Sequence, residues 1–496
     1  MLQAKSDFSL VIFGASGHLA KLRIFPALYF MALKKRCQVH YNIVGYARSA
    51  VDDAGFRTQF ADSVKRNVEG VNEKVLAELL AHVHYERGQY DDVAGFCSLA
   101  KRLNALEKNY GKDAVRVAYL SVPPPMFGSI ARGLCEGGIH ASTLRQAQDR
   151  LSSAQVELRE HGEHFRCIVE KPLGSDYRSA EDIQHQLLRC FQPEEIYLLD
   201  HYLGKEAARN IYYLRLVNPI VERVLKNTLI TNVQITASES AGLEGRAGYF
   251  EAVGTLRDMF QSHMLELMAL ITMHLVERTQ LKVARLEALK NIYVPPAANL
   301  SDVVVQGQYT AGNGHHGYRE EEGVAADSRT PTFIAMKLMT RVPRWQGTPF
   351  YLRSGKCLAA KETRISFTYQ NAYAMPNVAV EPNRLEIILQ GEAGMRVYLQ
   401  TKQGGSEPLF RPLVLEDPLV CVGDCMDEHG LLLLEAINGK RDWFLDFEEV
   451  MTAWKLIDPL QAYLEKSDTP LALYPAGSRG PKELEEWMKK EGGVWI

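Results

Sequence analysis

The chain has 496 residues, a length typical of two or three domains rather than one. Hydrophobic residues make up 46% and charged residues 24%, the balance of a globular protein, which excludes global disorder. The formal net charge of −3 provides no basic field for binding nucleic acid.

Strands alternate with helices in the first 199 residues. An apolar run followed by a glycine turn, a stretch with helical periodicity and a second apolar run form a βαβ unit. Two further apolar runs, each closed by proline, continue the pattern. The sequence therefore predicts an α/β, Rossmann-type domain over residues 1–199. Its predicted elements are strands at residues 8–13, 41–47, 115–122 and 165–170 and helices at 19–33 and 126–136.

Residues 200–496 have a different pattern. Several of their apolar runs alternate with polar residues, as in an antiparallel sheet with one exposed face. We therefore expect an α+β domain with a large, mainly antiparallel sheet. The predicted strands are 228–239, 332–340, 364–369, 385–389 and 395–401, with an apolar helical region at 254–276 and, before this domain, a polar surface insertion at His140–Glu163.

A glycine-containing turn follows the first predicted strand. Glycines in such a turn let the backbone approach a pyrophosphate, and the next helix offers free N–H groups to it. The pattern falls short of G-x-G-x-x-G, and a tight strand-to-helix turn without a ligand would look the same. The turn consists of Gly14, Ala15, Ser16, Gly17, His18 and Leu19.

The end of the second predicted strand indicates which dinucleotide binds. An NAD-binding unit usually has an acidic residue there, which binds the ribose 2′-hydroxyl. This sequence instead has Arg48 followed by Ser49. A cation beside a hydroxyl suits a 2′-phosphate and favours NADP. An ordinary exposed arginine is the alternative.

Two groups of residues offer acid–base chemistry and phosphate binding. Asp200–Lys205 places an acid, an imidazole, a phenol and an ammonium within six residues, although a structural loop could have this composition. Asp258 and His263 follow on the apolar helix, five residues apart and so on different faces of an α-helix. A base with a pKa of about 7 suits alcohol oxidation, and a carboxylate such as Asp200 would orient it. A buried core histidine is the alternative.

Three lysines lie beside glycine or proline turns, where phosphate ligands are often found. Lys171 precedes Pro172 at the end of a predicted strand, the edge at which α/β sheets bind ligands. Lys356 is the last residue of the segment RSGK, and Lys361 follows shortly after that segment. Each could equally be an ordinary surface lysine.

Together these motifs resemble the glucose-6-phosphate dehydrogenase family. DHYLGKE at residues 200–206 is similar to the active-site signature of that family. Further motifs occur in the family's order over nearly the whole chain: GASG at residue 14, GYARS at 45, EKPLG at 170, GRAGYFE at 245, RDMFQSH at 257, PFYLRSGK at 349 and AGSRGP at 476.

The resemblance implies oxidation of C1 of glucose 6-phosphate to 6-phosphogluconolactone, with direct hydride transfer to NADP and no metal. His263 would accept the C1 hydroxyl proton, Asp200 would orient its imidazole, and Pro172 would follow a cis peptide. The implied substrate-binding residues are Lys171, His201, Tyr202, Lys205, Glu239, Asp258, Lys356 and Lys361, and the implied cofactor-binding residues are Gly14, Ala15, Ser16, Gly17, His18, Leu19, Arg48, Gln89, Tyr90 and Lys171.

The chain departs from the family pattern at His18, where the family usually has an acidic residue, and at Leu199, where it usually has a basic one. An NADP-binding regulatory paralogue without catalysis, or a dehydrogenase of another sugar phosphate, are the alternative functions. The N-terminal residues lack the apolar segment of a secretory signal, and the eight cysteines are scattered. We therefore expect a cytoplasmic protein with reduced thiols, which binds no membrane. The resemblance further implies that residues 200–496 bind the substrate and form a homodimer or homotetramer.

Overall fold

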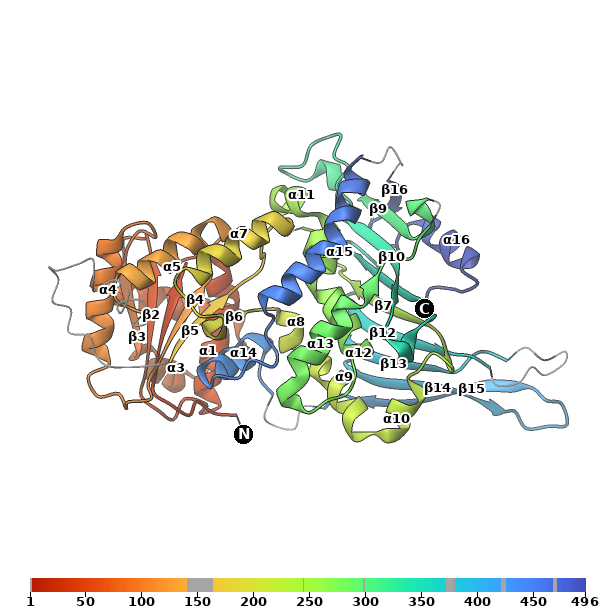
Figure 1. The fold of residues 1–496 in the computed structure, drawn as a ribbon, viewed down its shortest axis with the longest axis horizontal. Coiled ribbons are helices and arrows are strands. Elements are labelled where there is room, and N and C mark those ends of the chain that lie inside the picture. The colour runs from red at the N-terminus through yellow and green to blue at the C-terminus, as the bar shows by residue number, and fades with distance from the viewer. Residues whose placement is uncertain are drawn as a thin grey trace. The chain divides into compact units, whose positions relative to one another are not determined.

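The computed structural model describes residues 2–140, 164–243, 245–297, 299–371, 378, 380–420, 425–466 and 471–496. The chain forms two compact units, drawn in Figure 1. Unit 1 comprises residues 1–204 and 421–451, and unit 2 comprises residues 205–420 and 452–496. The sequence predicts one boundary, at 199/200, and in the structure the first segment of unit 1 ends at residue 204. The sequence pattern assigns residues 421–451 to the second domain, whereas in the structure they belong to unit 1. Residues 141–163 of the expected insertion lie outside the described residues.

Unit 1 is built on a parallel sheet of six strands with the order β3-β2-β1-β4-β5-β6. Its central strand is buried along its whole length, which explains the continuous apolar run in the sequence. This order is that of two mononucleotide-binding halves, and it confirms the predicted Rossmann-type fold. The strands are β1 (Phe8–Phe13), β2 (Tyr41–Ala47), β3 (Val83–Arg87), β4 (Val115–Leu120), β5 (Phe165–Val169) and β6 (Ile196–Leu198).

Helices cover the two faces of this sheet. The strand order advances in opposite directions from β1 and from β4, so right-handed crossovers place the connecting helices on opposite faces. Asp52, Asp92 and Asp176 cap three of the helices by accepting hydrogen bonds from free backbone N–H groups. One group is a π-helical turn η1 (Ala20–Ile24), α1 (Phe25–Leu33), α2 (Asp53–Asn67), α3 (Glu73–Leu80) and α14 (Glu428–Ile437). The other group is α4 (Val93–Leu106), α5 (Phe127–Glu136) and α7 (Tyr177–Leu188), and α8 (His201–Gly204) ends the first segment of the unit.

Unit 2 contains a mixed sheet of ten strands, mainly antiparallel, as the sequence predicts. Its order is β15-β14-β13-β12-β7-β11-β10-β9-β16, with β8 paired to β10. Among the described strands of this sheet, β7 with β11 and β9 with β16 are parallel neighbours, and the other pairs are antiparallel. The strands are β7 (Ile230–Ser238), β8 (Ile292–Tyr293), β9 (Val304–Thr310), β10 (Phe333–Thr340), β11 (Phe350–Gly355), β12 (Glu362–Tyr369), β13 (Arg384–Gln390), β14 (Gly394–Lys402), β15 (Phe410–Pro418) and β16 (Ala472–Pro475).

The helices of unit 2 include one segment that the sequence does not predict. The apolar region predicted at 254–276 is helical, but its first part, η4 (Leu256–Met264), is a π-helix that continues into α12 (Leu265–Thr272). The buried Arg285 Nε lies 3.0 Å from Glu266 Oε2 and ties α12 to α13 (Leu281–Lys290). The other helices are α9 (Glu206–Val217), α10 (Pro219–Val224), α11 (Ala247–Thr255), α16 (Lys482–Lys490) and α15 (Phe447–Lys466), which begins in unit 1.

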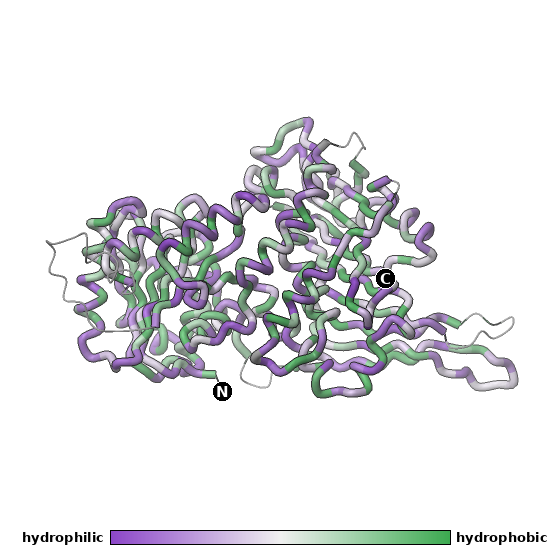
Figure 2. The backbone as a smooth tube through the Cα atoms, in the orientation of Figure 1, coloured by the Kyte–Doolittle hydropathy of each residue, from purple (hydrophilic) through white to green (hydrophobic). Residues whose placement is uncertain are grey.

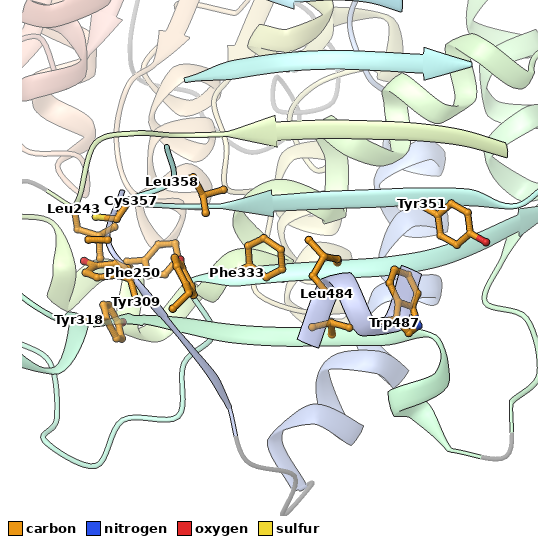
Figure 3. Packing of buried hydrophobic residues seen from close by; sticks show 14 of the residues in the cluster. Leu243, Phe250, Tyr309, Tyr318, Phe333, Tyr351, Cys357, Leu358, Leu484 and Trp487 are labelled. Carbon is orange, nitrogen blue, oxygen red and sulfur yellow. The ribbon is translucent and has the colours of Figure 1, made fainter. Parts of the chain in front are cut away.

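A buried cluster fills unit 2 along β9, β10 and β11. Figure 3 shows Leu243, Phe250 and Cys357 at one end of these strands and Tyr351 and Trp487 at the other. Elsewhere, hydrophobic and hydrophilic residues alternate along the helices, as expected for elements with one buried face (Figure 2).

Among the described residues, no helix has the length and apolar character needed to cross a bilayer. Six described cysteines are free, among them Cys37 and Cys357. Cys425 is disulfide-bonded, so the expectation of reduced thiols is wrong at this position.

Candidate active site

The glycine turn predicted to hold a dinucleotide follows β1 in unit 1. Gly14 has a φ of +82°, and a Cβ at this position would lie 2.2 Å from the Ser121 carbonyl oxygen after β4, so only glycine fits. Gly17 N–H donates to the Gly14 carbonyl at 2.8 Å and closes the turn. The helix begins at His18, which is exposed, while Ala15 is buried. The turn therefore lies where the strand order reverses and presents a helix N-terminus, a suitable place for a pyrophosphate.

The predicted 2′-phosphate residue, Arg48, lies exposed directly after β2. The Tyr85 hydroxyl donates to the carbonyl oxygens of Ala47 and Ser49, at 2.9 and 2.8 Å, and so fixes the backbone on both sides of Arg48. Burial raises the pKa of Tyr90, while a hydrogen bond to the Gly14 backbone and the charge of Arg48 lower it, so Tyr90 lies near both the turn and Arg48.

Gln89 is exposed, and its carbonyl oxygen accepts a hydrogen bond from the Tyr46 hydroxyl at 3.2 Å. That contact anchors the segment after β3 to β2. The predicted cofactor residues follow three strands: the glycine turn follows β1, Arg48 follows β2, and Gln89 and Tyr90 follow β3. They therefore all lie at the carboxyl edge of one sheet.

The EKPLG segment follows β5 in unit 1. The peptide between Lys171 and Pro172 is cis, which confirms the expectation for Pro172. Glu170, just before it, is buried and accepts a hydrogen bond from the Tyr119 hydroxyl at 2.6 Å. Burial raises the pKa of Glu170 to about 7. His429 Nε2 of α14 lies 3.7 Å from Glu170 Oε1, so residues 421–451 contribute to the surroundings of Lys171.

Asp200, His201 and Tyr202 follow β6 at the same edge of the sheet. Asp200 is fully buried, and its Oδ1 accepts a hydrogen bond from the Tyr202 N–H at 2.8 Å. The rings of His201 and Tyr202 lie 5.0 Å apart, and His201 is partly exposed. The start of this signature is therefore one ordered group in which a buried carboxylate lies beside an imidazole and a phenol.

In unit 2 the structure brings together three predicted substrate residues, Glu239, Asp258 and Lys356. Lys356 Nζ donates to Glu239 Oε2 at 2.7 Å and lies 3.3 Å from Asp258 Oδ2. Glu239 and Lys356 follow the carboxyl ends of the parallel neighbours β7 and β11, which explains how residues so distant in sequence meet. The two carboxylates, roughly 36–41% exposed, can accept hydrogen bonds from sugar hydroxyl groups.

His263 lies in the π-helix η4 of unit 2 and is 4% exposed. A π-helix bonds residue i to residue i+5, which brings residues five apart towards the same face. Asp258 and His263 therefore lie at a smaller angle around the helix axis than in the α-helix assumed from the sequence. π-helical turns occur frequently at functional sites.

The remaining lysines of unit 2 differ in their surroundings. Lys205 Nζ lies within hydrogen-bond distance, 3.3 Å, of Gln390 Oε1 at the end of β13, whereas Lys361 is exposed before β12. Asp200 belongs to unit 1 and His263 to unit 2, so their expected pairing stays a prediction. Sequence reasoning missed Tyr85, Gln390 and His429, because nothing in their local sequence indicates a site.

Two family models match the chain almost end to end. The glucose-6-phosphate dehydrogenase NAD-binding domain matches residues 11–210, and the C-terminal domain of the same family matches residues 212–496. The chain is 33% identical to glucose-6-phosphate 1-dehydrogenase of Chlamydia pneumoniae, covering 98% of this chain and 95% of that one, and 30% identical to that of Leuconostoc mesenteroides, covering 98% of each.

Solved structures agree with these relatives. A glucose-6-phosphate dehydrogenase in complex with its substrate glucose 6-phosphate has a TM-score of 0.87 at 27% identity, with full coverage of both chains. Glucose-6-phosphate 1-dehydrogenase of Mycobacterium avium has a TM-score of 0.83 at 26% identity, covering 99% of this chain and 98% of that one.

Proposed function

The chain belongs to the glucose-6-phosphate dehydrogenase family, whose reaction oxidises C1 of glucose 6-phosphate to 6-phosphogluconolactone, and we propose that this chain transfers the hydride to NADP. This reaction is the first step of the oxidative pentose phosphate pathway. The observation that supports NADP is Arg48, which follows β2 where an NAD-binding unit has an acidic residue.

The cofactor-binding residues are proposed to lie in unit 1. The turn from Gly14 to Leu19 would hold the pyrophosphate on its N–H groups, and Arg48 would bind the 2′-phosphate. Gln89 and Tyr90 would line the adenosine side, and Lys171 would contact both the cofactor and the sugar. When bound, the nicotinamide ring accepts the hydride at C4.

The residues of this chain supply the proton transfer and the charge. His263 accepts the proton of the C1 hydroxyl, and Asp200 orients the imidazole and stabilises its protonated form. Glu239 and Asp258 bind sugar hydroxyl groups, and Lys356 holds the two carboxylates in place. His201, Tyr202 and Lys205 bind the 6-phosphate, and Lys361 assists on the substrate side.

A comparison of initial rates tests the substrate and the cofactor together. Purified protein is given glucose 6-phosphate or free glucose, each with NADP or NAD. The proposal predicts the largest kcat/KM for glucose 6-phosphate with NADP, and a large loss with free glucose, which lacks the phosphate. Equal kcat/KM for the two cofactors would contradict the assignment of NADP.

Oligomerisation is proposed to use the edge of the unit 2 sheet. β15 ends the strand order and is exposed along nearly its whole length, including Leu413, Val414 and Leu415 at 38%, 45% and 51% exposure. An exposed, apolar edge strand readily pairs with a second copy. We expect a homodimer or homotetramer by light scattering, and monomers after Val414→Lys.

The cytoplasmic location stays a prediction, which cell fractionation tests.

A further inference from the structure

Arg87 is the last residue of β3 and lies in register with Ala47, the last residue of β2. Its Nε donates a hydrogen bond to the Arg48 carbonyl oxygen at 3.3 Å, and both arginine side chains are exposed. Two guanidinium groups therefore lie at the carboxyl ends of neighbouring strands, on adjoining backbone.

Two acidic residues near this edge, Asp53 and Glu86, are already paired with another cation. Asp53 Oδ2 accepts from Arg102 at 2.6 Å, and Glu86 lies 3.6 Å from the same guanidinium. Among the described residues, neither Arg48 nor Arg87 forms an ion pair with a carboxylate. Neighbouring like charges repel, and an anion bound between them removes that cost.

The backbone that carries these charges is rigidly held. The Tyr85 hydroxyl bonds the carbonyl oxygens on both sides of Arg48, and Asp53 Oδ1 accepts from the Tyr85 N–H at 2.7 Å. Because Tyr85 is two residues before Arg87 on the same strand, the two side chains point to the same face of the sheet. The backbone around Arg48 and Arg87 is thus in place before any ligand arrives.

We propose that Arg87 is a second specificity-determining residue, which contacts the 2′-phosphate of NADP together with Arg48. The inference rests on the proposed NADP function. A 2′-phosphate carries close to two negative charges and three acceptor oxygens, enough for two guanidinium groups. NAD has only a hydroxyl at this position, so Arg87 raises the affinity for NADP and leaves the affinity for NAD nearly unchanged.

Direct binding tests this proposal without turnover. Dissociation constants for NADP and NAD are measured by titration calorimetry with the parent chain, Arg87→Ala, Arg48→Ala and Arg66→Ala. Arg66 is an exposed arginine at the far end of α2 and serves as the matched control. We expect Arg87→Ala to raise the Kd for NADP about tenfold, the size of one lost charge-assisted contact, and to leave the Kd for NAD within about twofold.

Salt gives a second measure. The dependence of the NADP Kd on ionic strength should weaken in Arg87→Ala and stay unchanged in Arg66→Ala. Arg87→Lys, which keeps the charge, should fall between the parent and Arg87→Ala. An NADP Kd unchanged in Arg87→Ala would overturn the proposal, and so would an equal loss for NADP and NAD, which would place Arg87 on the adenine instead.

The same titrations separate this inference from the function it rests on. If Arg48→Ala loses NADP preference and Arg87→Ala does not, the role of Arg87 fails while the 2′-phosphate site stands. If neither variant changes the NADP to NAD ratio, the assignment of NADP to this edge fails, and with it the role of Arg87.

Discussion

The Lys356 ammonium lies 2.7 Å from the Glu239 carboxylate, at the ends of two parallel neighbouring strands. Burial lowers the pKa of Lys356, but the Asp258 and Glu239 carboxylates outweigh burial and raise it above its usual value. Lys356 is therefore charged at any pH at which the enzyme would work. It can hold two carboxylates, which otherwise repel each other, in position for the sugar hydroxyl groups.

Lys356→Met should raise the KM for glucose 6-phosphate about tenfold or more, because the two carboxylates would move apart or take up protons. The measurement is steady-state kinetics with the cofactor at saturation. Lys290→Met, at an exposed lysine of α13 that pairs with Glu287, is the matched control and should leave KM unchanged. An unchanged KM in Lys356→Met would show that the cluster does not bind sugar.

Lys205→Ala should raise the KM for glucose 6-phosphate by weakening a charge-assisted contact with the 6-phosphate, again about tenfold. Lys205 Nζ lies 3.3 Å from Gln390 Oε1, at the end of β13. The activity with free glucose, measured at high concentration, should change little. If both substrates are affected alike, the phosphate lies elsewhere.

Arg48→Ala should narrow the preference for NADP over NAD by about tenfold in kcat/KM, because the 2′-phosphate loses a guanidinium partner. The ratio of the two kcat/KM values is the quantity to compare. A ratio equal to that of the parent chain would refute the 2′-phosphate assignment.

Most of the fold could be predicted from hydrophobic patterning. The bounds predicted for the first two strands, 8–13 and 41–47, match β1 and β2, because these runs are buried on both faces and end at turns. The return of residues 421–451 to unit 1 could not be predicted. It depends on long-range packing of α14 against β4 and β5, which leaves no local signal.

The candidate site was predictable in its residue types but not in its geometry. The turn at Gly14 and the cation at Arg48 can be predicted from the sequence because each follows a strand in a βαβ unit. The π-helix around His263 was not, because periodicity does not distinguish π from α over nine residues. Arg87 was missed because a charged residue at a strand end is ordinarily a solvated one.

Glu170 should make the free energy of unfolding fall as pH rises, whereas a carboxyl group whose pKa is lowered on folding makes it rise. Burial raises its pKa in the folded state to about 7, against about 4.3 unfolded, so the folded state binds the proton more tightly. Its contribution to stability is fully present below pH about 4.3 and is lost as pH rises through about 7. Glu170→Gln should therefore gain Tm relative to the parent chain as pH rises across this range.

The comparison with the parent removes the titrating groups that lie away from Glu170. Burial lowers the pKa of His429, 3.7 Å from Glu170, to about 4, so its contribution has the opposite sign and is lost as pH falls through that value. Glu69→Gln, at an exposed position, is the control and should show no such trend. A Tm difference for Glu170→Gln that does not vary with pH would mean that Glu170 is ionised throughout.

The most direct test is the rate of cofactor reduction by glucose 6-phosphate and NADP, followed by absorbance of the reduced nicotinamide, in the parent chain and in His263→Asn. The base acts in the transition state, so we predict turnover in the parent and a fall in kcat of about 10²–10⁴-fold in the variant, with a modest change in KM. An unchanged kcat in His263→Asn, or no turnover in a parent chain that binds NADP, would contradict the account.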